Sequence, residues 1–169
     1  MNSPFANLFL AIQQRIADQV TSITFIDQDL GQLSSGTNPA VSWPCVLIDI
    51  EDFKFSELGE NAQLSEGIIS LKLGFTTTSS SEEATPLTYR QNAIAFYDIE
   101  WNLHKALQGW SPGNDFGYFT RIHTFTEHRA DAIRLRHISY RIAFEDYSTA
   151  NTETLVVATI EPQLQFITT

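Results

Sequence analysis

Apolar residues near the N-terminus recur at steps of three and four, the spacing of one face of an α-helix. The pattern runs from Phe5 to Val20, and Ser3 followed by Pro4 is typical of a helix N-terminus. The sequence therefore predicts an amphipathic helix of about five turns at the start of the chain. Its apolar face consists of Phe5, Leu8, Phe9, Ile12, Ile16 and Val20.

A second helical pattern spans Thr88 to Trp110 in the middle of the chain. Glu100 alone interrupts its apolar stripe, and Gly109 and Pro112 follow where a helix should stop. We expect one continuous amphipathic helix that separates a strand pair before it from a strand pair after it. The stripe consists of Tyr89, Ala93, Phe96, Leu103, Leu107 and Trp110.

Alternation of apolar and polar residues predicts the strands around that helix. The expected ranges are Cys45 to about Phe55, Gly67 to Thr77, about Tyr118 to Glu127, and Ile133 to Asp146, with Ile23 to Ile26 as a candidate short strand. The apolar phase changes after Leu135, which indicates either a bulge or an end of the strand that projects beyond the sheet with both faces in use. The predicted fold is α+β: a mostly antiparallel sheet of about four to five strands packed against two helices, in the order α-β-β-α-β-β plus a C-terminal β-prone arm.

The segments between these elements are polar and rich in turn-forming residues. Gln28 to Ser42 predicts a long loop and a candidate contact element, and Glu57 to Glu66 predicts a connection between strands. We expect residues 1–147 to form a single α+β domain and residues 148–169 to form a C-terminal extension or arm. The β-prone stretch from Leu155 to Ile160 would either cover an edge of its own sheet or add to a neighbour's.

The charge of the chain is strongly acidic and unevenly distributed. Twenty acidic residues face ten basic ones, a formal net charge of −10, which argues against sequence-specific binding of nucleic acid. From Asp27 to Glu66 every charged residue except Lys54 is acidic, whereas five of the ten basic residues lie between Arg121 and Arg141. Two interpretations remain open: two solvated faces, or acidic and basic surfaces of adjacent copies that meet head to tail as in a ring.

No motif for catalysis, cofactor binding or metal binding appears in the sequence. Cys45 is the single cysteine, so no intramolecular disulfide forms, and its apolar neighbours predict a buried structural thiol. The histidines lack metal-site spacing: His104, beside Lys105, is expected on the surface, and His123 and His128 at a solvated hairpin end. No apolar run approaches the roughly 20 residues that cross a bilayer. We therefore expect no enzyme, no cofactor and no contact with a membrane.

Three short segments carry a resemblance to a known family. Trp43 to Leu47 opens the first central strand after a Gly-rich loop, Ala106 to Trp110 ends the central helix, and Tyr140 to Asp146 closes the last strand. Together with the order of elements over residues 4–147, they make the chain similar to the tail terminator (tail completion) proteins of long-tailed bacteriophages and related minor tail proteins. The C-terminal arm departs from the shorter members of that family.

The resemblance implies a structural virion protein of the tail or neck, assembled in the cytoplasm of a bacterial host. Such a protein forms a ring, commonly a hexamer, that caps the tail tube, and its partners are further copies of itself, the tail tube protein and the head-connector protein. DNA would pass through the ring without specific binding, since an acidic lumen repels it. On this interpretation the lumen is lined by Glu51, Asp52, Glu57 and Glu60, and the neighbouring subunit is contacted by Arg129, Arg134, Arg136 and Arg141.

Two alternatives remain open. One is another head–tail connector or a subunit of a contractile injection machine, which shares every feature used so far. The other is a small-molecule-binding or enzymatic α+β domain, which would need a concave apolar pocket with convergent polar groups.

Overall fold

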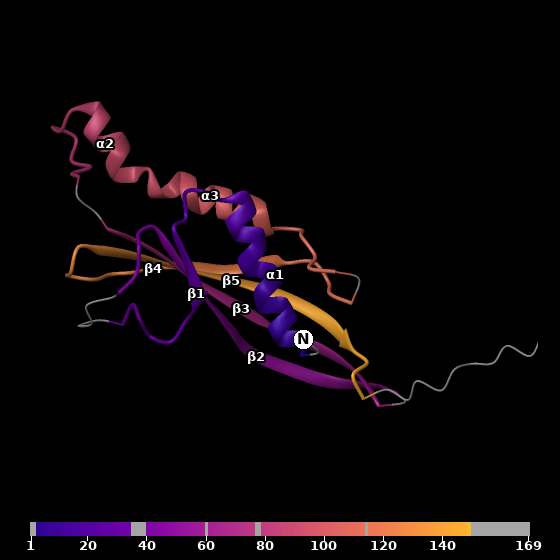
Figure 1. Cartoon of the computed structure of the whole chain (residues 1–169). Helices are drawn as coiled ribbons and strands as arrows, with labels where there is room; N and C mark the ends of the chain where they lie inside the picture. The colour runs from indigo at the N-terminus through magenta and orange to yellow at the C-terminus, as the bar shows by residue number, and fades with distance from the viewer. Residues whose placement is uncertain (1–2, 35–39, 60, 77–78, 114, 150–169) are drawn as a thin grey trace, which may run out of the picture.

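Helices lie against one face of a five-stranded sheet in a computed structural model that describes residues 3–34, 40–59, 61–76, 79–113 and 115–149 (Figure 1). The helices are α1 (Pro4–Gln19), α2 (Leu87–Ile94) and α3 (Phe96–Leu107). The strands are β1 (Phe25–Gln28), β2 (Cys45–Gly59), β3 (Ala62–Thr76), β4 (Thr120–Glu127) and β5 (Ile133–Asp146). Residues 150–169, which include the predicted C-terminal arm, lie outside the described part.

The sheet has the strand order β1-β2-β3-β5-β4. β1 runs parallel to β2, and each of the other neighbouring pairs is antiparallel. This arrangement confirms the predicted α+β fold with a mostly antiparallel sheet. The short strand predicted around Ile26 is β1, at one edge of the sheet, and β4 is the opposite edge.

The main core lies between the helices and the sheet. Leu8, Ile12 and Ile16 of α1 are fully buried, as the helical periodicity predicted. Ser3 caps α1, because its Oγ accepts a hydrogen bond from the backbone N–H of Ala6. α3 adds Leu103 and Leu107 to this core. The strands add the side chains that face the helices, which include Val46, Ile48, Ile69, Leu71, Leu73, Ile138 and Tyr140.

A smaller core covers part of the opposite face of the sheet. Cys45 and Leu47 of β2 and Leu135 of β5 pack there against Leu33, from the loop between β1 and β2. This second core explains the change of apolar phase in β5, since Leu135 faces the small core while Ile138 faces the large one. Both faces of β5 are in use at this end, but the end does not project beyond the sheet, since Ile133 pairs with Thr76 of β3 and Leu135 with Glu127 of β4. The register shift between β4 and β5 lies opposite Ser139 and Tyr140, after the change of phase.

The single helix predicted over Thr88–Trp110 is wrong, because the chain forms two helices with a break at Ala95. Only α3 packs on the sheet: Leu103 and Leu107 are fully buried, whereas no residue of α2 is buried. The start of α3 lies over the end of the sheet, where Phe96 contacts Phe75 near the last residue of β3. α2 rises away from the sheet (Figure 1), and none of its residues is buried. Helical periodicity of apolar residues predicts that a helix can form, but tertiary packing determines which of its residues are buried.

The connection predicted over Glu57–Glu66 is also wrong, because β2 and β3 continue through it as a long hairpin. Glu57 pairs with Gln63, and a bulge shifts the register between Glu51 and Lys54. Asp52 within the bulge has a φ of 35°, and the chain reverses after Gly59, whose φ is 103°. Sequence alternation is weak here because these strand residues are mostly exposed on both faces.

Candidate interaction surfaces

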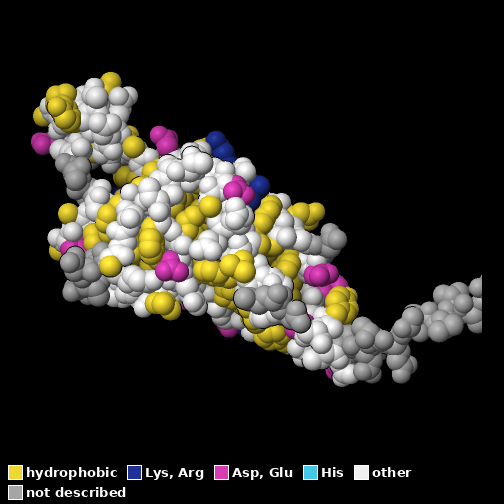
Figure 2. Space-filling model, in the orientation of Figure 1, with side chains coloured by type: hydrophobic (Ala, Val, Ile, Leu, Met, Phe, Trp, Pro, Cys, Tyr) yellow, Lys and Arg dark blue, Asp and Glu magenta, His cyan; other side chains and the backbone are white. Residues whose placement is uncertain are grey.

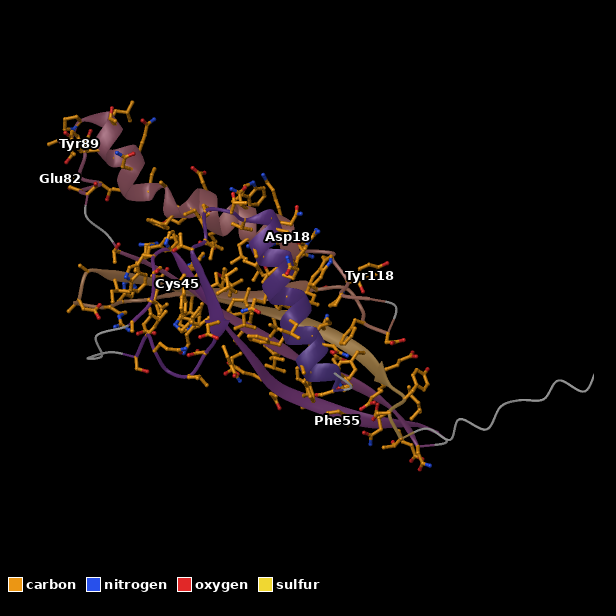
Figure 3. All side chains as sticks on the ribbon, viewed as in Figure 1. Asp18, Cys45, Phe55, Glu82, Tyr89 and Tyr118 are labelled. Atoms are coloured by element: carbon orange, nitrogen blue, oxygen red, sulfur yellow. The ribbon has the colours of Figure 1, made fainter. Side chains whose placement is uncertain are left out.

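The described residues contain no cluster of His, Cys, Asp and Glu side chains that could hold a metal ion. Cys45 is fully buried, as predicted, and burial raises the pKa of its thiol to about 11 (Figure 3). In the same described part no helix is long and apolar enough to span a membrane.

His104 differs from the expectation of a plain surface residue. Its side chain is half-buried, with Nδ1 3.4 Å from the hydroxyl of Tyr140, which is fully buried in the main core. Burial, and to a lesser degree the charge of Arg121, lower the pKa of His104. Burial also raises the pKa of Tyr140 to about 12. This pair is a part-buried contact between α3 and β5.

The acidic residues predicted to face a lumen lie on the projecting part of the β2–β3 hairpin. Glu51, Asp52 and Glu57 are exposed and make no ion pair with other described residues. Glu60, the fourth predicted residue, lies outside the described residues. The hairpin therefore carries unneutralised negative charge, which is the property that the lumen hypothesis needs.

Two of the arginines predicted to contact a neighbour are engaged within the chain. Arg129 has a side chain only 2 % exposed, which bonds to Asp131, Glu127 and the backbone oxygen of Leu33. These contacts fasten the β4–β5 turn to the loop that covers the small core.

Arg136 binds Glu100 of α3, with Nε 3.0 Å from each carboxylate oxygen, and Arg136 Nη1 also donates to the hydroxyl of Thr126. Glu100 is 8 % exposed. The acid that interrupts the predicted apolar stripe is thus a buried partner of Arg136, and both residues act in the fold.

The other two predicted contact arginines remain accessible. Arg134 lies over the ring of Phe96, at 3.9 Å from its centroid, and donates a hydrogen bond to the hydroxyl of Tyr97. The side chain of Arg141 is 57 % exposed and only 3.7 Å from Glu66, a loose surface ion pair of small energy. Arg141 is therefore free to meet a partner without loss of a buried contact, whereas Arg134, with its Nε buried, offers only the outer part of its guanidinium.

A surface that the sequence did not indicate lies along α2 and the outer side of α3. Its apolar residues are 46–60 % exposed, and we call them the exposed helix surface: Leu87, Tyr89, Ile94, Tyr97 and Trp101. Figure 2 shows hydrophobic side chains gathered on the projecting α2, and Figure 3 shows Tyr89 at its outer end. Helical periodicity assigned Tyr89 to the core. Leu87 and Tyr89 are two positions apart and do not share a helix face, so the sequence pattern did not predict an exposed apolar surface here.

A groove of about 650 Å³ lies on the helix side of the sheet, next to the end of β1. Phe5, Phe9 and Leu10 of α1 form one wall, and Ile48, Ile50 and Phe53 of β2 form the other. Asp49 and Gln28 supply its polar groups. The lining is mostly apolar, and the groove carries no arrangement of a nucleophile with a base.

No family model and no curated protein matches the chain. Among solved structures, a chain in the virion of a native gene transfer agent (GTA) particle is similar, with a TM-score of 0.43 and 12 % sequence identity. That alignment covers 86 % of this chain and 100 % of the other.

Proposed function

We propose that this chain is a non-enzymatic structural subunit of a phage-like particle. More specifically, we propose a tail terminator whose copies form a ring that caps the tail tube and docks to the head connector. The order of elements, which resembles that of the tail terminator proteins, suggests the family. The surfaces described above supply independent support for assembly.

The observation that carries the proposal is the exposed helix surface. Its side chains lie on the projecting α2 and on the adjoining start of α3. Exposed apolar side chains gathered in this way are typical of a protein–protein contact site. α2 lies at one end of the molecule and the β2–β3 hairpin at the other (Figure 1). A contact of α2 with an unlike patch of the next copy leaves the hairpin free to face the lumen. Such a contact is heterologous, and heterologous contacts close into rings when the rotation permits.

The charges fit this arrangement. Arg134 lies against Tyr97 at the edge of the exposed helix surface, so it and the accessible Arg141 are the arginines that we retain for contact with a neighbour. Glu51, Asp52, Glu57 and Glu60 are the residues that we propose to line the lumen, where unneutralised carboxylates would keep DNA from binding as it passes. Arg129 and Arg136 instead serve the fold.

The test is polymerisation of the tail tube protein from the same genome, with and without this chain. A terminator added during polymerisation should stop growth, so that tubes in negative-stain images become shorter as the ratio of this chain to tube protein rises. Rings should be visible at one end of the tubes. Tubes of unchanged length with no added density at either end would contradict the terminator assignment.

Another head–tail connector or a subunit of a contractile injection machine would share the exposed helix surface. Imaging of labelled protein on whole particles distinguishes these roles, because a terminator lies at the junction of tube and connector.

The groove beside β1 favours a second candidate function of a different class, the binding of a small apolar molecule. Its volume of about 650 Å³ lies within the ordinary range of ligand pockets, about 300–1,000 Å³. A ligand that binds there should raise the melting temperature, and substitution of Phe9 by Asp should remove that shift.

A further inference from the structure

The edge of the sheet formed by β2 is only partly covered. β1 pairs with Cys45–Ile48 and ends there, whereas β2 continues to Gly59. The backbone oxygen of Ile48 points to this side, since it accepts a hydrogen bond from the N–H of Asp29. Strand alternation turns the backbone groups of Ile50 the same way and, beyond the bulge at Asp52, those of Phe55 and Glu57. A long unpaired edge of this kind is a template for another strand.

The apolar groove lies beside this open edge, where β1 stops. Phe53 projects toward α1, and its ring meets Phe5 edge to face at 5.1 Å between centroids. Phe55 also faces Phe5, at 6.4 Å, and remains 48 % exposed (Figure 3). A strand added along β2 would pair its free backbone groups and place alternate side chains into the groove and against these two rings.

We propose that residues 155–160 of the same chain, Leu-Val-Val-Ala-Thr-Ile, dock as an added strand along β2 between Ile50 and Glu57. The strand runs antiparallel to β2, because β2 runs toward the hairpin tip and the chain approaches from that tip. This contact stands apart from the ring: it needs one molecule only, and it would hold in any of the assemblies considered above.

The end of β5 directs the chain to this edge rather than to β4. Thr149 donates a hydrogen bond from its hydroxyl to the backbone oxygen of Asn61, 2.7 Å away, at the tip of the β2–β3 hairpin. On the opposite side of β5, the backbone of residues 115–117 is already bonded to Ala143 and Glu145. The chain therefore leaves the described part beside the turn between β2 and β3, while the backbone on the other side of the end of β5 is already paired.

Length and composition suit the occupant. The five residues from 150 to 154 span at most about 18 Å, at roughly 3.3–3.6 Å per residue, enough to pass round the hairpin tip and bring Leu155 to the outer side of β2. Val156, Val157 and Ile160 are β-branched and favour strands. Because the tether is short, the effective concentration of the segment at the β2 edge of its own molecule is of millimolar order. The same segment of another copy would have to compete with it.

The test is hydrogen–deuterium exchange of peptides that cover residues 50–58 in the full-length chain. In Val156→Pro/Val157→Pro, one of the two lost amides must face β2, because neighbouring amides of a strand point to opposite sides. Exchange in 50–58 should rise about tenfold or more over the wild type, while peptides of β4 stay unchanged. The matched control Thr152→Pro/Glu153→Pro, before the docked segment, should keep the wild-type protection.

Equal exchange of residues 50–58 in the wild type and in Val156→Pro/Val157→Pro would overturn the proposal. The measurement is repeated at a tenfold lower protein concentration. Protection that persists on dilution supports docking within one molecule, and protection that is lost would assign the edge to another copy and overturn it.

Discussion

Glu100 and Arg136 join α3 to the sheet, and a change of either residue tests whether this pair belongs to the fold. Arg136 Nε lies 3.0 Å from both carboxylate oxygens, and the two side chains are 21 % exposed for Arg136 and 11 % for Glu100. Replacement of Glu100 by Gln keeps the size of the side chain and removes its charge. The guanidinium of Arg136 then remains half-buried without a charged partner, and keeps neutral hydrogen bonds only, to the introduced amide oxygen and to the hydroxyl of Thr126.

The expected cost follows from the burial of the pair. Removal of one partner from a fully buried ion pair costs about 3–5 kcal/mol, and an exposed pair contributes about 0–1 kcal/mol. Because Arg136 keeps about a fifth of its side chain in water, we expect Glu100→Gln to lower the free energy of unfolding by about 2 kcal/mol. For a chain of this size that corresponds to a fall of roughly 4–8 °C in melting temperature.

The assay is urea unfolding followed by circular dichroism, as a double-mutant cycle of Glu100→Leu and Arg136→Met. The double variant should be less destabilised than the sum of the single ones by about 1–2 kcal/mol, since neither charge is left alone. A loss below about 0.5 kcal/mol for Glu100→Gln, together with additive single changes, would refute the structural role of the pair. Arg136→Glu, which sequence reasoning alone offers as a test of ring contact, would place two carboxylates face to face and report on folding instead.

Three further predictions concern individual side chains. Cys45, with a pKa of about 11, should not react with a thiol reagent at pH 8 until urea unfolds the chain; fast labelling of the native protein would contradict its burial. His104 takes up a proton less readily in the folded chain, so stability should fall as pH drops below the ordinary pKa of 6.5, and His104→Gln should flatten that part of the pH–stability curve. Gly67→Ala should cost about 1–3 kcal/mol by urea unfolding, because a Cβ there would lie 2.3 Å from the ring of Phe53; an unchanged midpoint would show that the ring moves freely.

The sequence predicted the sheet and α1 well, because both bury one regular face. β5 begins at Ile133 and ends at Asp146, as expected, and the change of phase after Leu135 correctly indicated that both faces of this strand are used. The sequence also predicted the C-terminal end of α3 at Gly109, which has a φ of 72°, the left-handed conformation typical of such a cap.

The errors arise where packing rather than pattern decides. The periodicity of residues 88–110 continues across Ala95, but α2 rises away from the sheet, so only α3 gains a buried face. The hairpin around Glu57 has exposed residues on both faces, so alternation could not reveal its strands. Short motifs and hydrophobic periodicity therefore do not predict which residues of α2 or of the β2–β3 hairpin are buried.

Charge alone also could not separate free arginines from engaged ones. Arg136 binds Glu100, 36 positions away in sequence, which only the fold brings close. Arg129 binds Glu127 and Asp131, its near neighbours in sequence, but its burial against Leu33 also depends on the fold. The four acidic residues of the predicted lumen, Glu51, Asp52, Glu57 and Glu60, remain a prediction that awaits an assembled ring. The exposed helix surface, which carries the proposed function, became apparent only once α2 was placed away from the sheet.

Sedimentation velocity of the wild type and of Leu87→Glu/Tyr89→Glu tests the central claim most directly. Both side chains are more than half exposed, so the variant should keep the wild-type melting temperature. The wild type, alone or with tube protein, should sediment as a ring several times heavier than the 19.0 kDa chain, and the variant as a monomer. Gln91→Glu, which adds a charge on α2 without removing an apolar side chain, should still form the ring. A wild type that stays monomeric at high concentration with and without tube protein, or a variant that forms the same ring, would contradict assembly through the exposed helix surface.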